Sequence, residues 1–262
     1  MSAPPAVNRV RATAWIVAEA HGRLPRLRSQ APLVLRPTRD AVYLVSAGGG
    51  PVGGDVLDLR IEVRAGAALR LATVAASVAL PGADGAESVL AVQASVAPGG
   101  VLEYLPEPMV VADGARHTTD VRVDLASGAT LVLRDEVVLG RHGERGGACR
   151  TRLRADYGGS PLLRHDVAVD GTDGASLGPA VLAGHRAYGT VLVAGECASD
   201  FAGVPASPDA AVMPLAGPGV LISALAADSL ALRRLLDSAA ARGLRDRPAG
   251  PPRSAAAAAG PR

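Results

Sequence analysis

The fold is decided by residues 56–69, which read VLDLRIEVRAGAAL. Over residues 56–63, apolar side chains alternate strictly with charged ones, so an extended segment has one apolar and one charged face. This alternation favours a half-buried antiparallel strand. A small-residue turn at Gly66 follows, and a second apolar run begins directly after it.

The same strand-turn-strand pattern returns twice along the chain. Its turns are centred on Gly66, Gly99 and Gly128, about 30 residues apart. Self-similarity at this period is typical of stacked supersecondary units. We therefore predict an all-β fold, a layered β-helix-like stack of strands. Because ordinary β-hairpins also favour glycine in their turns, a set of unrelated hairpins is the alternative.

Length and composition favour a single domain. A chain of 262 residues buries one sizeable core, and its apolar fraction of 48% comes mainly from small aliphatic residues that suit closely packed sheets. We predict one β-rich domain over residues 1–247, with a C-terminal helix over residues 229–242 that Asp228 or Ser229 caps. Residues 248–262 contain Pro, Ala and Gly without periodicity, so a disordered tail is expected.

Composition and net charge also limit the classes of molecule that this protein is expected to bind. Aromatic residues make up 2% of the chain and the formal net charge is +2, which argues against nucleic acid and against sugar binding by ring stacking. All basic residues are arginine, which we attribute to compositional bias. No signal peptide is recognised, and the longest charge-free run, residues 210–227, is interrupted by Pro and Gly. We expect a cytoplasmic protein without a membrane span, and two reduced thiols at Cys149 and Cys197.

A glycine-rich turn precedes the first strand of the repeat. Residues 46–55 read SAGGGPVGGD. Its motif residues are Gly49, Gly50, Gly53, Gly54 and Asp55. A phosphate-binding loop is excluded, because no Lys-Ser/Thr pair follows and the next element is a strand instead of a helix N-terminus. The segment predicts a shaped turn that delivers Asp55 to a fixed place.

The sequence contains no G-x-S-x-G or H-E-x-x-H motif, so no enzyme is predicted. The five histidines are scattered, and a structural role is the simpler interpretation for each. Acidic residues near the turns converge if the layers stack, and their carboxylates then bind a divalent cation weakly. These residues are Asp55, Glu103, Glu107, Asp113, Asp135 and Glu136. Solvated turn acids without a shared site are the alternative.

Three motifs, in this order and at these separations, resemble the UreD family of urease accessory proteins, called UreH in some organisms. They are GGPVGGD at 49–55, LEYLPEP at 102–108 and VLGR at 138–141. The resemblance implies a non-enzymatic scaffold of β-helix-like fold that binds urease apoprotein and a UreF-type partner. With a UreG-type GTPase, that assembly supports nickel delivery, so nickel is in transit and no cofactor is tightly bound.

The resemblance also implies roles for particular residues of this chain. Asp55 becomes a nickel waypoint, and the remaining motif residues are the turn glycines with Leu105, Pro106, Gly140 and Arg141. A different class remains open, a β-solenoid carbohydrate-active enzyme with paired carboxylates roughly 5–9 Å apart. Such an enzyme usually has aromatic sugar platforms, which this chain lacks. A structural oligomerising module is the third interpretation, and the glycine-Asp turn argues against it.

Overall fold

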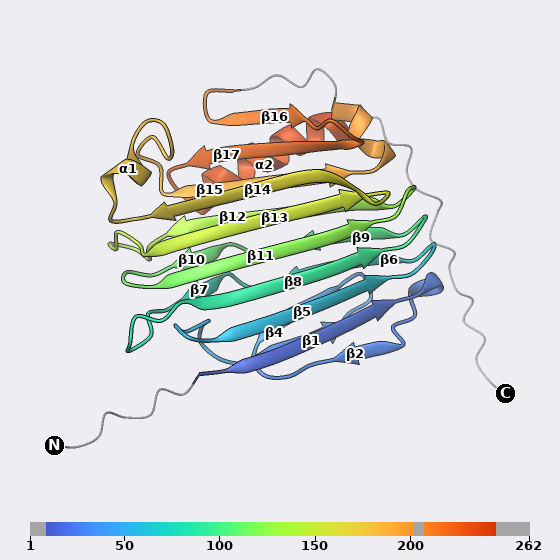
Figure 1. Ribbon diagram of the computed structural model, residues 1–262, viewed down its shortest axis with the longest axis horizontal. Helices are drawn as coiled ribbons and strands as arrows, with labels where there is room; N and C mark the ends of the chain where they lie inside the picture. Colours follow the sequence, from blue (N-terminus) through green and yellow to red (C-terminus); the bar gives the residue numbers. More distant parts are fainter. Residues whose placement is uncertain (1–8, 202–206, 245–262) are drawn as a thin grey trace.

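The computed structural model describes residues 9–201 and 207–244. Two β-sheets stack face to face, and the chain passes repeatedly from one to the other (Figure 1). The apolar faces of both sheets meet in a core of small aliphatic side chains, in which Leu59, Leu102 and Leu131 are fully buried. The predicted all-β, β-helix-like architecture is confirmed.

The seven-stranded sheet has the strand order β14-β13-β11-β8-β5-β1-β2. Its strands are β1 (Arg11–Ala18), β2 (Arg26–Arg28), β5 (Val56–Val63), β8 (Ser88–Val96), β11 (Arg116–Leu125), β13 (Ala148–Tyr157) and β14 (Ser160–Asp170). Its strands alternate between buried and more exposed positions, as expected for a sheet with one face on the core.

The ten-stranded sheet has the order β16-β17-β15-β12-β9-β6-β4-β3, with β10 and β7 paired beside this path. Its strands are β3 (Leu33–Pro37), β4 (Val42–Ser46), β6 (Ala68–Thr73), β7 (Ser77–Ala79), β9 (Val101–Leu105), β10 (Met109–Val111), β12 (Thr130–Leu139), β15 (Ala187–Ala194), β16 (Ala210–Pro214) and β17 (Gly219–Ala226). The charge-free run thus forms β16 and β17, the two short strands expected from its sequence.

The three glycine turns occupy equivalent places in successive layers, as predicted. They join β5 to β6, β8 to β9 and β11 to β12, and their glycines have φ values of +66°, +67° and +78°. The Gly66 amide donates to the Pro98 carbonyl at 3.3 Å, and the Gly99 amide to the Gly128 carbonyl at 3.2 Å. Hydrogen bonds between turns therefore continue the stacking of the strands.

One expectation for residues 56–63 is wrong. β5 is parallel to both of its neighbours, β1 and β8, and not antiparallel. A chain that coils through two sheets returns to each sheet in the same direction, which makes successive strands parallel. The strict alternation shows that one face of the sheet is buried and the other faces solvent. It does not distinguish a parallel strand from an antiparallel one.

Helix α2 (Ser229–Leu244) covers the outer face of the ten-stranded sheet, behind β17 and β15 in Figure 1. The Asp228 carboxylate accepts a hydrogen bond from the Ala231 amide at 2.8 Å and caps the helix, as predicted. Leu232 and Leu236 are fully buried against the sheet. The shorter helices are η1 (Ala20–Gly22), α1 (Gly174–Leu177) and η2 (Glu196–Phe201). The expected tail at 248–262 lies outside the described residues.

Candidate functional site

The ten-stranded sheet is interrupted in two neighbouring strands. Residues 74–76 separate β6 from β7, and residues 106–108 separate β9 from β10. β12 continues past this break, pairing with β9 up to Leu133 and with β10 from Val137 onward. Residues 134–136 therefore lack a ladder partner on that side, and we call the interrupted region the sheet break.

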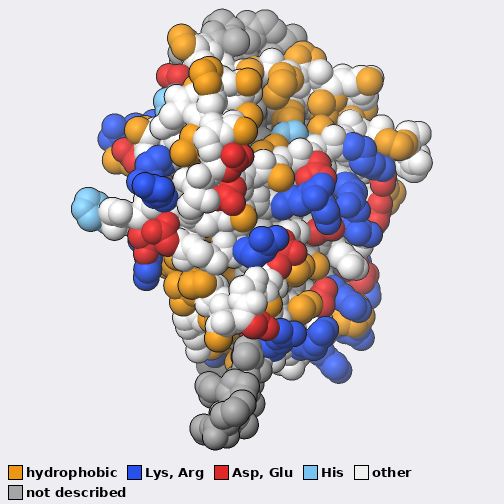
Figure 2. Space-filling view, turned by 60° about the vertical axis from the view of Figure 1, so that its left-hand side comes forward, with side chains coloured by type: hydrophobic (Ala, Val, Ile, Leu, Met, Phe, Trp, Pro, Cys, Tyr) orange, Lys and Arg blue, Asp and Glu red, His pale blue; other side chains and the backbone are white. Residues whose placement is uncertain are grey.

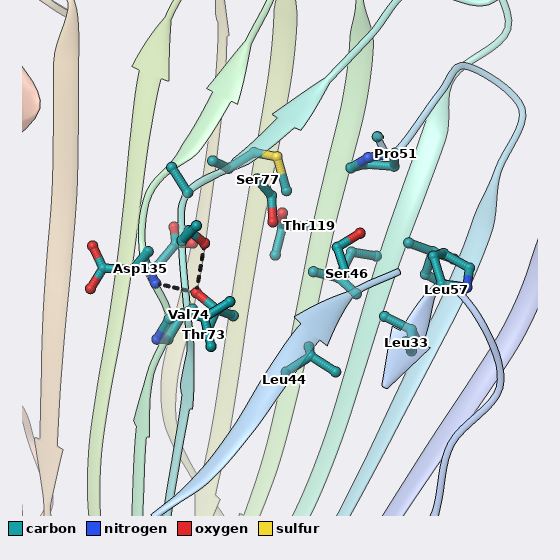
Figure 3. Close-up of a pocket in the computed structure, with 18 of the residues that line it drawn as sticks. Leu33, Leu44, Ser46, Pro51, Leu57, Thr73, Val74, Ser77, Thr119 and Asp135 are labelled. Carbon is teal, nitrogen blue, oxygen red and sulfur yellow. Dashed lines mark hydrogen bonds between the residues drawn. The ribbon is translucent and has the colours of Figure 1, made fainter. Parts of the chain in front are cut away.

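A cavity of about 300 Å³ lies beneath the sheet break. Leu57 and Thr119 line it from the seven-stranded sheet, while Leu44 and Asp135 line it from the ten-stranded sheet (Figure 3). Tyr104 of the ten-stranded sheet also lines it. The glycine turn and residues 74–76 also contribute to its wall. The cavity is mostly apolar with a few polar groups, a composition typical of a binding site.

The Asp55 carboxylate lines this cavity and is only 5% exposed. Its Oδ1 accepts a hydrogen bond from the Val10 amide at 2.8 Å, and its Oδ2 accepts one from the Val52 amide at 2.9 Å. The carboxylate thus ties the N-terminal segment to the glycine turn. The turn fixes Asp55 in place, and its role toward nickel stays a prediction.

Two glycines of this turn have a physical requirement for glycine. A Cβ on Gly53 would lie 2.4 Å from both the Ala86 carbonyl oxygen and the Gly82 amide nitrogen. Gly54 has a φ of +93°, in the left-handed region. Gly50 also has positive φ, whereas Gly49 has open space around it. The turn is therefore shaped by close backbone packing between residues 53 and 82.

Asp135 is the second acid on the cavity wall. Its side chain leaves β12 on the face opposite to its neighbours and points into the cavity (Figure 3). Burial, reinforced by the nearby charge of Glu136, raises the pKa of Asp135 to about 7, against a smaller lowering effect of Thr151. Near neutral pH this carboxyl is therefore close to half protonated.

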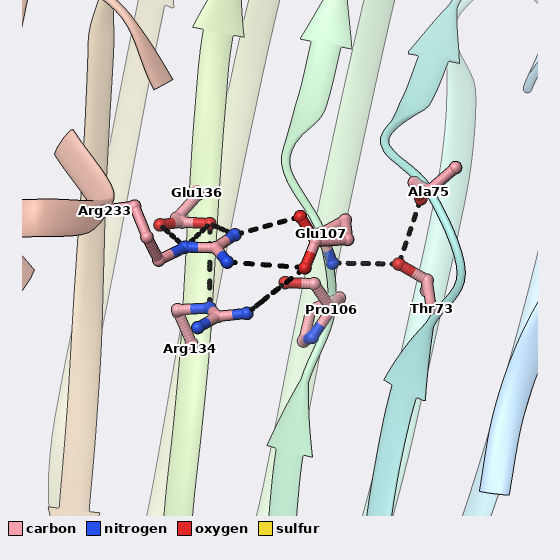
Figure 4. Close-up of polar contacts among 7 residues, drawn as sticks. All are labelled: Thr73, Ala75, Pro106, Glu107, Arg134, Glu136 and Arg233. Atoms are coloured by element: carbon pink, nitrogen blue, oxygen red, sulfur yellow. Dashed lines mark hydrogen bonds and ion pairs between the residues drawn. The ribbon is translucent and has the colours of Figure 1, made fainter. Parts of the chain in front are cut away.

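Arg134 and Glu136 face the opposite side of β12, under helix α2, where they join an ion-pair cluster with Glu107 and Arg233 (Figure 4). Arg233 Nε donates to both Glu136 oxygens, at 2.7 and 3.0 Å, and its terminal nitrogens reach Glu107 at 3.2 and 3.3 Å. Arg134 donates to the Pro106 carbonyl at 3.3 Å. The cluster thus holds the edge of the sheet break where the ladder is missing.

A buried hydrogen-bond chain lies on the seven-stranded sheet. The His117 ring lies 2.9 Å from the Ser88 hydroxyl and 3.1 Å from the Thr119 hydroxyl, and burial lowers its pKa to about 4. Cys149 and Cys197 are both reduced thiols, as predicted, and burial raises the pKa of the Cys149 thiol to about 12. Such a thiol is neutral and unsuited to metal ligation at physiological pH.

Of the remaining predicted residues, Pro106 lines the cavity and the others lie apart from it. Glu103 pairs with Arg70 at 3.5 Å, and the Asp113 carboxylate accepts a hydrogen bond from the Gly146 amide at 2.6 Å. Gly140, with φ of +76°, and Arg141 form the turn after β12, where Arg141 donates to the Glu144 carboxylate at 2.8 Å. Leu105 ends β9, and Pro106 begins the break.

Asp55 and Asp135 thus line the cavity, and Glu107 and Glu136 of the ion-pair cluster border it at the sheet break, so this region holds four of the six suggested acids. No group of three or more His, Cys, Asp or Glu side chains that could hold a metal ion occurs among the described residues. Sequence reasoning missed Arg134 and Arg233, because nothing in the pattern of α2 indicated which polar residue would meet the sheet break. It also missed Thr119, which reads as an ordinary strand residue.

Comparisons with known proteins identify the family of this chain. The family model described as UreD urease accessory protein matches residues 11–256. The chain belongs to the UreD family. It is 43% identical to a urease accessory protein UreD of Parafrankia sp. (strain EAN1pec), with 91% of this chain and 90% of that protein covered. It is 46% identical to urease accessory protein UreD 3 of Streptomyces griseus subsp. griseus, with 88% and 95% covered.

Membership of the UreD family helps to decide between the protein classes that the sequence analysis left open. The chain is 42% identical to a urease accessory protein UreD of Streptomyces coelicolor, with 88% of this chain and 96% of that protein covered. These matches confirm the resemblance and give the carbohydrate-active alternative no support. Over the described part of the chain, none of the helices is both long and apolar enough to cross a bilayer.

Proposed function

We propose that this chain is a non-enzymatic urease maturation scaffold. It binds urease apoprotein together with UreF-type and UreG-type partners and supports insertion of nickel into the urease active site. Membership of the UreD family and the shared names of its relatives support this proposal. The same role places the protein in the cytoplasm, with no nucleic acid and no membrane as partners.

The observation that carries the proposal is the cavity beneath the sheet break. Asp55 and Asp135 supply carboxylate oxygens to a wall that is otherwise mainly apolar. Carboxylates bind divalent cations, and a few such ligands without a closed coordination shell release the ion readily. We therefore assign Asp55 and Asp135 as nickel waypoints, with nickel as cargo and no tightly bound cofactor.

The raised pKa of Asp135 makes the proposed transfer dependent on pH. Only the deprotonated carboxylate binds a cation, and its fraction rises between about pH 6 and pH 8 because the pKa is about 7. Nickel insertion supported by the parent chain is expected to rise over this interval, and Asp135→Asn is expected to remove that dependence.

The test is urease activation in a reconstituted operon that carries Asp135→Asn or Asp55→Ala. Urease specific activity and nickel content are measured beside the level of soluble accessory protein. Asp124→Asn is the matched control, because Asp124 is exposed on the outer face of the seven-stranded sheet. Activation equal to the parent in both cavity variants, at equal soluble level, contradicts the waypoint assignment.

Partner binding is tested separately by co-expression and pull-down. The tagged chain is expected to co-purify with a UreF-type protein and with urease apoprotein, and to gain solubility from the UreF-type partner because exposed apolar surface is then covered. Full solubility alone, together with no co-purification of either partner, contradicts the scaffold role.

A further inference from the structure

A row of arginines crosses the outer face of the seven-stranded sheet. Residues in direct register on all seven strands form it, each paired with the next. From β2 to β14 they are Arg28, Trp15, Arg60, Gln93, Arg122, Arg154 and Arg164. We call this set the arginine row. It contains five arginines and no acid, although like charges on adjacent strands repel.

At the β11–β14 end, the arginines of the row pair with neighbouring acids. Arg122 lies 3.5 Å from Asp120, and Arg154 lies 3.8 Å from the same carboxylate. Arg164 forms an ion pair with Asp156. Figure 2 shows arginine and acidic side chains interspersed along its right-hand side, over this outer face. Each arginine in this half of the row therefore lies within 4 Å of a carboxylate.

At the β1–β2 end, the arginines do not form such pairs, although Asp58 and Glu62 flank Arg60 on β5. Among the ion pairs of the described residues, none includes Arg26, Arg28 or Arg60. All three side chains are exposed. Glu62, two residues from Arg60, is instead bonded to Arg64 at 3.1 Å.

The same corner holds Trp15, the only tryptophan of the chain. The Arg26 guanidinium carbon lies 4.0 Å from the centre of its ring, a cation–π contact. Arg28 and Arg60 flank Trp15 on the two adjacent strands. Tryptophan and arginine are the residue types most enriched among those that dominate binding energy in protein interfaces.

We propose that Trp15, Arg26, Arg28 and Arg60 form a docking site for an acidic segment of a partner protein. Carboxylates of that segment pair with the arginines here, as Asp120 and Asp156 do at the other end of the row. The partner segment packs against the exposed part of the Trp15 ring. Carboxylates of another chain thus form the ion pairs that these arginines do not form within the sheet.

The surroundings of the site favour an acidic protein segment over a phosphate polymer. Asp58 and Glu62 flank Arg60, and Asp124 lies nearby in a groove that reaches Trp15. These acids repel a continuous polyanion, whereas a short segment with two or three carboxylates fits between them. From β2 to β5 the site spans two strand spacings, about 10 Å, which suits one peptide segment.

Trp15 supplies a direct reporter, because all tryptophan emission of the chain comes from this site. Purified full-length protein is titrated with a hexaglutamate peptide at low salt. We expect a saturable change in emission that weakens with added salt, and about tenfold weaker binding in the double variant Arg28→Gln, Arg60→Gln. The matched control, Arg154→Gln with Arg164→Gln, removes the same charge and is expected to bind as the parent does.

Three results overturn the proposal: no change in emission, equal weakening in both double variants, or tighter binding of a hexathymidylate oligonucleotide or of phosphatidylserine vesicles than of hexaglutamate. Circular dichroism verifies that each variant is folded. If Arg28→Gln with Arg60→Gln unfolds the chain, Arg28→Gln alone replaces it and is expected to weaken binding about threefold. The titration uses this chain alone, so its outcome is independent of the urease role.

Discussion

The two sheets of this protein are built from the same repeats and yet differ in continuity. β8, β11 and β13 of the seven-stranded sheet run for 9, 10 and 10 residues, with unbroken pairing between neighbours. In the ten-stranded sheet, β6 and β9 stop after 6 and 5 residues and resume as three-residue strands. One sheet is a continuous wall and the other has an opening.

The difference shows where a repetitive fold makes room for a site. Regular pairing satisfies backbone groups and leaves side chains alternating between core and solvent. Pro106 and Pro108 lie in the break, where each lacks the amide proton that a ladder requires. The missing ladder exposes the cavity, and the ion-pair cluster replaces the lost hydrogen bonds.

The largest expected loss of stability comes from a substitution in the connection between the two sheets. Gly53 lies in the connection from β4 to β5, and Gly53→Ala places a methyl group 2.4 Å from two backbone atoms. Because these backbone atoms can move away only at a large energetic cost, we expect a loss of more than about 3 kcal/mol in the free energy of unfolding. Gly49→Ala is the matched control, since nothing lies within 4 Å of its Cβ position. Similar urea-unfolding midpoints for both variants contradict this account.

The next prediction compares the stability that an ion pair contributes on each of the two sheets. Arg233→Ala leaves the Glu136 side chain, which is 0% exposed, without its main partner, so we expect a loss of about 3 kcal/mol. Arg150→Ala removes an exposed pair of similar geometry with Asp166 on the seven-stranded sheet, with an expected loss below about 1 kcal/mol. Denaturant unfolding measures both. Equal losses show that the sheet break does not depend on this cluster.

A companion variant separates lost charge pairing from lost packing. Arg233→Met combined with Glu136→Leu removes both charges and keeps apolar volume under α2. We expect this double variant to regain most of the stability lost in Arg233→Ala, because no unpaired buried charge remains. A double variant as unstable as the single one indicates that packing of the Arg233 stem dominates.

The sequence predicted the regular parts of this molecule and only part of the irregular one. Gly66, Gly99 and Gly128 identified the layers, because stacked turns need the same backbone conformation at each step. Strand direction was not encoded in the alternation of residues 56–63. Asp135 was visible as an acid on a strand, but the encounter of Arg233 with Glu136, 97 residues away, depends on tertiary packing that no local pattern records.

A third prediction concerns the cavity wall. Asp135 has a pKa raised to about 7, so the folded state binds more protons than the unfolded state between about pH 4 and pH 7. Stability from this group is therefore full at low pH and falls as the pH rises to 7. At pH 8, Asp135→Asn is expected to be more stable than the parent by an amount on the order of 2 kcal/mol. Thermal unfolding at pH 4.5 and pH 8 checks this difference, which is expected to shrink at the lower pH.

The smallest expected effect lies in the continuous sheet. The pKa of His117 is lowered to about 4, so the unfolded state binds more protons between about pH 6.5 and pH 4. The parent is expected to lose about 1 kcal/mol from this residue between pH 7.0 and pH 5.5. His117→Gln retains hydrogen-bonding groups for Ser88 and Thr119 and is expected to lose less over this interval. An unchanged pH slope in the variant shows that other groups cause the acid sensitivity.

The stacked layers also bear on how the chain assembles during synthesis. β5 pairs with β8, β8 with β11, and β11 with β13, so each new layer needs only the one made just before it. The order of translation therefore matches the order of assembly, and folding can proceed vectorially as the chain leaves the ribosome. Until β17 and α2 emerge, the last layer presents an open strand edge and bare apolar surface, and a chaperone is needed most in that interval.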